Sequence, residues 1–472
     1  MQPENFRFGG GASETLLHPI VLVAMLLTVL LVLLLPRKYV IIPFLASTFL
    51  IPLPQELLIG GLHFFVFRII FLTLLLRMTV LVFTSASEPF GGRLNRFDLF
   101  FLLWAVCRAA AVILIFRVSG AVVNQVAFLL DVLGAFFILR YLVWDDDDIA
   151  RAIKTLAVVS AVIAGFMVFE KVHGLNVFGI LGGVLLQPEV RDSVVRAQGP
   201  FQHEILAGTF GATLVPLFFL LWKTGKSTIL AVIGFAAATA ITFASASSTP
   251  LFAYVASLVA LCFFPFRRYM RLTRWAIVSA IAALSVVMKA PVWFLIARVG
   301  IVGGSSGYHR AMLVNNFVTR FSDWWLIGTK ENSTWGANMW DLSNQFVAEG
   351  QTGGLVTFIL FLTLICVAFS RLGRARKAVE GDRRQEWYFW AIGCALFAHV
   401  CAFMGISYFD QVRVLWFFVL VISVVAAAPY LQTAEARAPV SRLRPSSAFD
   451  PIRSPSPVLP VKHVASWRPE NF

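Results

Sequence analysis

The sequence predicts an all-α fold, a polytopic transmembrane bundle of about 12 to 13 spans with two long extracytoplasmic connections. The first indication is composition, because 59% of the residues are hydrophobic, only 14% are charged and the mean hydropathy is +0.80. A soluble protein is typically about half apolar and about a quarter charged. The second is that apolar stretches recur along most of the chain. Together they exclude a soluble enzyme and a protein anchored by a single span.

A helix that crosses a membrane needs about 20 apolar residues, which divides the chain into about thirteen candidate spans. A short N-terminal segment, 1–15, precedes them, and its composition predicts no cleaved signal peptide. The transmembrane domain is expected over 16–429. Its candidate spans are 16–35, 39–53, 62–83, 97–116, 121–143, 149–169, 205–222, 228–243, 250–266, 274–290, 354–370, 388–406 and 412–428.

Basic residues between the spans predict the orientation. They concentrate in alternate connections, from Arg37 and Lys38 to the run 371–384, and cytoplasmic connections carry such an excess. This accounts for the net charge of +14 without a nucleic-acid partner. The intervening connections, including the long ones at about 170–204 and 291–353, are then extracytoplasmic. The basic, Pro- and Ser-rich tail 430–472 is expected to be disordered and cytoplasmic.

Ionisable side chains within spans are functional candidates because burying them in lipid is costly. Arg108 and Asp131 lie at similar depth on consecutive spans, which predicts an ion pair that either locks two helices or serves a site. The acidic run 145–148 suits a helix start, where carboxylates face the positive end of the dipole, better than a metal site. The five cysteines all lie in apolar runs and have no metal-ligand spacing.

The first long connection combines arginines with a helix start. Arg191, Arg196 and His203 lie around a Gly-Pro break. Guanidinium groups donate paired hydrogen bonds to phosphate, and a helix N-terminus adds free N–H groups. The alternative is that the arginines only reach toward the membrane interface.

The second long connection predicts an amphipathic, interfacial helix that begins near His309 and Arg310. Trp335 and three further tryptophans follow, interleaved with polar residues such as Lys330 and Asp341. Aromatic rings beside carboxylates and amides suit sugar faces. The alternative is an ordinary aromatic belt at the membrane interface.

The segment "SNQFVAEGQTGGLVT" resembles a motif of the O-antigen ligase and polymerase family. In that motif a His and an Asn, Ser or Gln precede nine residues and then Gly-x-x-Gly, Thr or Tyr. Asn344, Gly354 and Thr357 match its spacing, whereas Ser343 stands where the family has its His.

Two other segments are similar to elements of the same family. Arg196, Gly199 and Phe201 resemble its Arg-x-x-Gly-x-Phe element. "ASASSTPLFAY" resembles its Ser-Arg-Gly/Thr element, with Ser248 in place of the Arg.

The resemblance implies an inner-membrane glycosyltransferase that takes a polyprenyl-diphosphate-linked glycan and needs neither a metal nor another cofactor. It would act in exopolysaccharide or O-antigen-type polysaccharide synthesis, in the bilayer and with assembly or export proteins as further partners. The resemblance assigns Arg196 and Arg310 to the diphosphate, with Arg191 as a third contact. Asp341 is favoured as the base because the family His is absent, and Glu349, His309 and His203 remain alternatives.

Ser343 and Asn344 occupy the motif positions of the predicted catalytic site, and Lys330 and Trp335 are expected to contact substrate. Two other functions compete with the transferase. One is a transporter of lipid-linked or anionic solutes, which should place its charges near the midplane on broken helices. The other is a catalytically inactive family member that binds lipid-linked glycan, as the loss of the His would allow.

Overall fold

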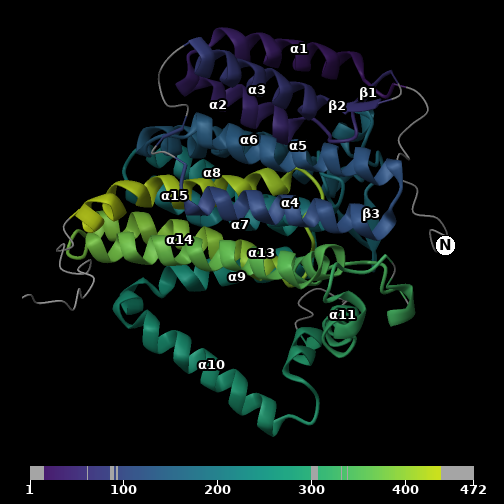
Figure 1. Cartoon of the computed structure of the whole chain (residues 1–472). Coiled ribbons are helices and arrows are strands. Elements are labelled where there is room, and N and C mark those ends of the chain that lie inside the picture. The colour runs from purple at the N-terminus through teal and green to yellow at the C-terminus, as the bar shows by residue number, and fades with distance from the viewer. Residues whose placement is uncertain are drawn as a thin grey trace, which may run out of the picture.

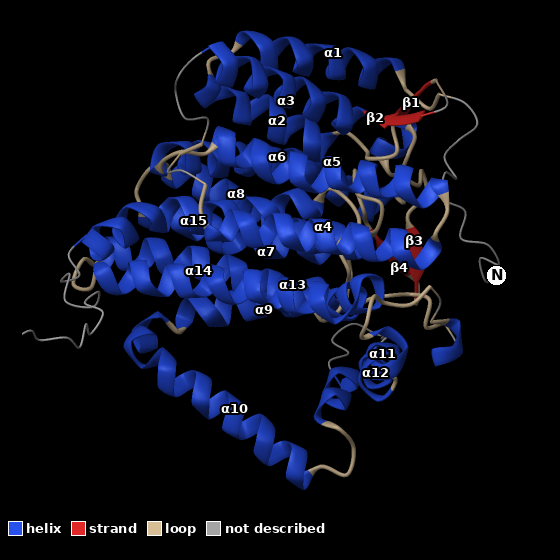
Figure 2. Ribbon diagram, in the orientation of Figure 1, coloured by secondary structure: helices blue, strands red, loops and turns tan. Residues whose placement is uncertain are grey.

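The computed structural model describes residues 15–60, 62–84, 90–91, 94–298, 307–330, 332–336 and 338–436. The predicted N-terminal segment and basic tail fall almost wholly outside this part. The described residues form stacked helices and two short antiparallel hairpins, β1(Glu56–Ile59) with β2(Leu62–Phe65) and β3(Glu189–Arg191) with β4(Val194–Arg196) (Figures 1 and 2). The long helices are α1(Pro19–Leu34), α2(Arg37–Leu50), α3(Val66–Thr84), α4(Arg96–Phe116), α5(Ser119–Leu142), α6(Asp146–His173), α7(Glu204–Lys223), α8(Thr228–Ala244), α9(Ser248–Cys262), α10(Met270–Val287), α13(Gln345–Ala378), α14(Arg383–Phe403) and α15(Val412–Ala436).

The all-α prediction is confirmed for the described residues. Each expected span falls on one of these helices, and nine helical segments of the described part are long and apolar enough to cross a membrane. Helices α1, α8 and α9 are apolar but shorter. The chain is therefore built as a multi-pass membrane protein.

The helix ends follow local sequence signals. Asn95 and Asp98 form a capping box at the start of α4. Asp145 accepts hydrogen bonds from the N–H groups of residues 147 and 148, so the predicted helix-start role of the acidic run is confirmed. Gly174 ends α6 in the left-handed conformation, with φ 67°.

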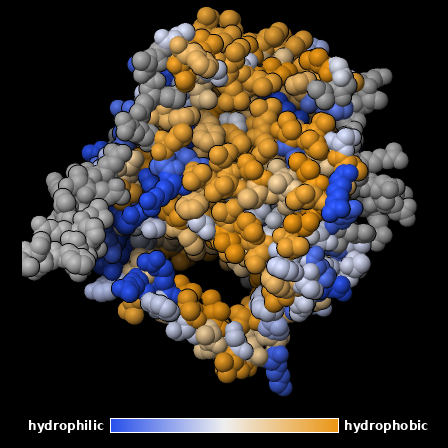
Figure 3. Space-filling view, in the orientation of Figure 1, coloured by the Kyte–Doolittle hydropathy of each residue, from blue (hydrophilic) through white to orange (hydrophobic). Residues whose placement is uncertain are grey.

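Burial separates central from peripheral helices. Helices α7 and α15 are about four-fifths buried, whereas α10 has no buried residue. The outer face of the bundle is predominantly apolar (Figure 3). Such a surface suits lipid, since water would solvate it poorly.

Both long connections lie at the end of the bundle that carries the hairpins (Figure 1). The second one contains η3(Val292–Arg298), α11(Gly307–Thr319), α12(Phe321–Trp324) and η4(Ser333–Trp335). Leu313 and Phe317 of α11 pack with Trp324 and Trp335 into a separate apolar cluster, and the rings of Phe317 and Trp324 stack at 4.0 Å. The apolar face expected to rest on the membrane interface is thus turned toward the protein itself.

Helix α13 begins earlier than the expected span 354–370, so the second connection ends at Asn344. It contains one non-helical residue, Gly354, with φ 71° and ψ −172°. The loop after α12 pairs with the interrupted backbone, because the Thr329 N–H donates to the Gln351 carbonyl and the Leu355 N–H to the Trp325 carbonyl, both at 2.8 Å. The interruption therefore fixes this loop against the bundle.

Candidate functional site

A buried carboxylate holds the chain after β4 in place. The N–H groups of Gln198 and Gly199 each donate to Glu170 of α6 at 2.9 Å. Asn176 donates to the Gly199 carbonyl, and Gln411 donates to the carbonyl of the following proline. Gly199 has φ 57°, a conformation that favours glycine. This anchored turn fixes the position of Arg196 directly before it.

Arg196 is buried at the junction of β4, α7 and the α8–α9 turn. Its Nη1 lies 2.6 Å from Glu204 Oε1 and 3.2 Å from Glu189 Oε1, and its Nη2 donates to Ser247 Oγ at 2.7 Å. Its Nε has no hydrogen-bond partner among the described residues. The guanidinium is thus oriented by protein groups and keeps one donor unused.

The ligand atoms of Glu189, His203 and Glu204 lie within 4.8 Å of one another, so this is a candidate metal group. Arg196 contacts both carboxylates, however, and a divalent cation would be repelled by a guanidinium already paired with its ligands. His203 also accepts from the Ile205 N–H, which caps α7. These contacts favour an ion-paired helix start over a metal site.

Arg310 lies on α11 and is 7% exposed. Its Nε is buried without a hydrogen-bond partner within the described part. Burial lowers the pKa of the Arg310 guanidinium, Asp341 opposes this shift, and the positive charges of Arg196 and Arg191 add to it. Residues more than a hundred positions apart are therefore brought into one electrostatic environment. We call Arg191, Arg196 and Arg310 the arginine cluster.

The residues expected to act on an acceptor hydroxyl lie next to this cluster. His309 Nε2 is 3.2 Å from the Asp341 carbonyl oxygen and 4.0 Å from its Oδ2. The Asp341 side chain is 55% exposed, so a substrate hydroxyl can reach it. Ser343 is buried, and its Oγ has no hydrogen-bond partner in the described structure.

Asn344 and Glu349 are committed to structural contacts. Asn344 caps α13 by accepting from the N–H groups of Phe346 and Val347, at 3.0 and 3.2 Å. Glu349 is buried and accepts from Trp104 Nε1 at 2.9 Å and from Gln345 Nε2 at 2.6 Å. Neither side chain is free to act as a base without losing these contacts.

The predicted ion pair between Arg108 and Asp131 is wrong. Arg68 pairs with Asp131 through two contacts of 2.7 Å, and Arg108 Nε lies 3.7 Å from Glu349. The reason is packing, because α3 lies against α5 and α13 lies against α4. Two opposite charges at similar depth on consecutive helices therefore need not pair with each other.

Two further predicted substrate contacts are outside the arginine cluster. Trp335 is buried in the apolar cluster of the second connection, and its Nε1 donates to Asp323 at 3.3 Å. Lys330 is exposed, with its Nζ 5.9 Å from the Phe116 ring centroid. Trp335 therefore stabilises the connection and offers no open face to a sugar.

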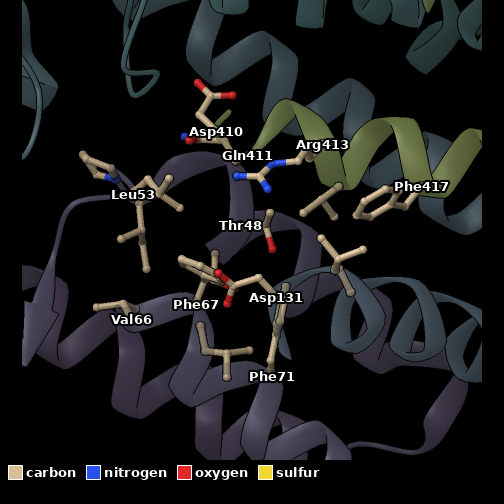
Figure 4. Close-up of a pocket in the computed structure, with 17 residues that line it drawn as sticks. Thr48, Leu53, Val66, Phe67, Phe71, Asp131, Asp410, Gln411, Arg413 and Phe417 are labelled. Atoms are coloured by element: carbon tan, nitrogen blue, oxygen red, sulfur yellow. The ribbon is translucent and has the colours of Figure 1, made fainter. Parts of the chain in front are cut away.

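Two adjoining cavities lie beneath the α14–α15 connection, on either side of Arg413. One, of about 50 Å³, is lined by Asp131, Asp410, Gln411 and Thr48 (Figure 4). The other, of about 30 Å³, is lined by Arg108 and Glu349. Burial raises the pKa of Asp410 to about 6, although it accepts from the Val412 and Gln202 N–H groups.

Sequence reasoning missed three of the cavity residues, Asp410, Gln411 and Arg413. Asp410 and Gln411 stand in a short connection, and Arg413 near the start of the last span was not considered as an intramembrane charge. Arg413 is an ionisable residue in an apolar run, and this was the signal in the sequence that could have identified it as a functional candidate. Arg413 Nη2 donates to the Phe409 carbonyl at 3.0 Å.

Comparison with known proteins adds no family: no protein-family model matches the sequence, and no curated protein matches it either.

Proposed function

We propose that the chain is an integral membrane glycosyltransferase, a polysaccharide polymerase or ligase that takes a polyprenyl-diphosphate-linked glycan as donor. The convergence of the arginine cluster at one end of an apolar helix bundle is the observation that carries this proposal. Two of its members are buried, and each keeps an Nε donor that has no partner among the residues that the structure describes. The resemblance of the segments around Arg196 and Asn344 to the O-antigen ligase and polymerase family supports the same function.

The chemistry assigns distinct roles to the two sides of the site. The acceptor hydroxyl attacks the anomeric carbon, and the bond from that carbon to the diphosphate oxygen breaks. The configuration of the anomeric carbon is thereby inverted. Negative charge grows on the leaving diphosphate, and the guanidinium groups of Arg196 and Arg310 stabilise it. Asp341 accepts the hydroxyl proton, with His309 beside it.

Donor binding requires a change in the partners of Arg196. Its guanidinium is paired with Glu204, which is buried, and with Glu189, whose side chain is 47% exposed. The diphosphate would replace the exposed carboxylate and leave the buried pair intact. Glu189 would thus be the group that the diphosphate displaces.

The proposed location is the bacterial inner membrane, with the arginine cluster at its outer face. The alternation of basic connections supports this orientation. It places the end with α11 and the hairpins on the side where cell-surface polysaccharides are assembled. The tail after residue 430 would then be cytoplasmic.

The direct test is transfer by the purified protein in lipid vesicles with a polyprenyl-diphosphate oligosaccharide and an acceptor. We expect a longer or transferred glycan and release of polyprenyl diphosphate, unchanged by a chelator. Donor binding without product would indicate the inactive family member. Loss of activity in the chelator would move the diphosphate role to a metal ion held by Glu189, His203 and Glu204.

A transporter is the second candidate, and the interior charges favour it. Arg108, Asp131, Glu349 and Arg413 line the two cavities, and α13 is interrupted at Gly354. Against this, the interruption lies near the end of α13 that carries the loops, whereas transporter sites lie near the midplane. Movement of the intact lipid-linked glycan across the vesicle membrane, without bond cleavage, would identify a transporter.

A further inference from the structure

Helix α10 stands away from the bundle. None of its residues is buried, and Figure 3 shows an open gap between this helix and the rest of the molecule, with apolar side chains along it. Its exposed residues include Leu272, Ile277, Ile281 and Val286. Its main contacts are with η2(Phe264–Tyr269) and η3, the turns at its own two ends. A helix of this kind in a membrane gains no packing from its own chain, so another apolar body has to fill the gap.

The end of α10 opposite to the arginine cluster is strongly basic. Arg267 pairs with Glu386, and Arg268 pairs with Glu380 at 2.9 Å. Arg271 and Arg274 are exposed and have no acidic partner within 4.0 Å among the described residues. They are three positions apart on a helix, so both side chains project from one face.

We propose that the gap between α10 and the bundle is a binding site for an anionic glycerophospholipid. Its acyl chains lie along the apolar side of α10, and its phosphate contacts Arg271 and Arg274. Exposed Tyr269 and Trp275 flank these arginines and suit the depth of a lipid headgroup. The proposal does not depend on the transferase function, because these arginines lie at the other end of the bundle.

Charge and shape distinguish this occupant from the others. A second copy of the chain would bring another basic end to the same place, and two such ends repel each other. A zwitterionic lipid would fill the gap but leave both guanidinium groups without a net countercharge. The lipid-linked glycan donor would place its diphosphate at the far end, near Arg310.

The test is native mass spectrometry of the full-length protein, purified from membranes and then equilibrated with phosphatidylglycerol or with phosphatidylcholine of the same acyl chains. We expect a retained phosphatidylglycerol and weaker retention of phosphatidylcholine. The double variant R271Q/R274Q should lower phosphatidylglycerol retention about thirtyfold, since each of the two basic groups near a headgroup contributes about 1 kcal/mol and about 1.4 kcal/mol is tenfold.

The matched control is K38Q/R96Q, which removes two exposed charges at the same end of the bundle from α2 and α4. It should leave lipid retention unchanged, and the melting temperatures of both variants should match the parent. If both double variants lost phosphatidylglycerol retention equally, net charge would explain the effect and the proposed site would be overturned. A lipid-free dimer, or retention of a polyprenyl phosphate in place of the phospholipid, would also overturn it.

Discussion

At the scale of single residues, Arg196 and Arg310 share a feature that most arginines of the chain lack. Both are buried at the polar end of the bundle, and each keeps an Nε donor without a partner in the described structure. A buried donor is costly unless something accepts from it. In the proposed transferase, the diphosphate of the donor would supply acceptors for these groups.

The first prediction follows from the planar fork of arginine. R196K and R310K should each lower kcat/KM for transfer at least tenfold, because an ammonium keeps the charge but loses the paired hydrogen bonds. R320K is the control, since Arg320 is exposed on the same connection. Normal turnover by both R196K and R310K would show that the diphosphate does not bind at these arginines.

The second prediction distinguishes the general base, Asp341, from the helix cap, Asn344. D341N should reduce the rate by about 10²–10⁴-fold with intact donor binding, as expected for loss of general base catalysis. N344A should instead lower stability by about 1 kcal/mol, because Asn344 caps α13. S343H, which introduces the His of the motif that this segment resembles, should increase transfer if Asp341 is a weak substitute for that His. Near-normal transfer rates in D341N would show that Asp341 is not the general base.

The third prediction concerns pH and Asp410. Its pKa is about 6 in the folded protein against a usual 3.8, so the folded state binds the proton more tightly than the unfolded state. Stability should therefore rise as pH falls from about 7 to about 4, by on the order of 1–3 kcal/mol from this group. D410N should lack this component. Parallel melting-temperature profiles of the two proteins between pH 5 and 7.5 would contradict it.

At the scale of elements, the interruption of α13 couples the bundle to the second connection. A Cβ at Gly354 would lie 2.7 Å from the Leu326 carbonyl oxygen, and the φ of 71° strains any other residue. Residues 326 to 329 hold Arg310 and Asp341 only indirectly, through the packing of α11 and α12. The interruption thus positions the site without touching a substrate.

The fourth prediction tests this coupling. G354A should destabilise the protein by about 1–3 kcal/mol, because alanine is strained at this positive φ and its Cβ would clash with the Leu326 carbonyl oxygen. G373A in the same helix meets no atom within 4 Å and should be neutral or slightly stabilising. The measurement is thermal unfolding in detergent. Equal melting temperatures would show that the interruption relaxes without cost.

At the scale of the whole molecule, the residues of the proposed site gather at one end of an apolar bundle. Helices α7 and α15 occupy the centre and both begin at that end, beside Arg196 and Asp410. The site is therefore built on the most buried elements. The buried partner Glu204 holds Arg196 in position, and in the proposed transferase donor binding would exchange only the exposed partner Glu189.

The fifth prediction is the orientation of the molecule in its membrane. A membrane-impermeant thiol reagent added from outside should label a cysteine introduced at Ser333 and spare one at Ser446. The native cysteines lie within helices, so the unmodified chain gives the background. The reverse labelling pattern would place the arginine cluster on the cytoplasmic side and exclude assembly of an outer polysaccharide there.

The sequence by itself determined the class of fold and the positions of the helices. Hydropathy does this because every span must present apolar side chains to lipid or to its neighbours, whatever the packing. The cap at Asp145 and the helix start after His203 were also readable, since capping depends on adjacent residues.

Only the tertiary structure decided which distant groups meet. Arg68, and not Arg108, pairs with Asp131, and Trp335 is buried. Arg310 lies close enough to Arg196 for the charge of Arg196 to influence it. The physical reason is that ion pairs and cavities depend on how helices rotate and pack against each other. Apolar faces all around these helices leave that rotation undetermined in the sequence.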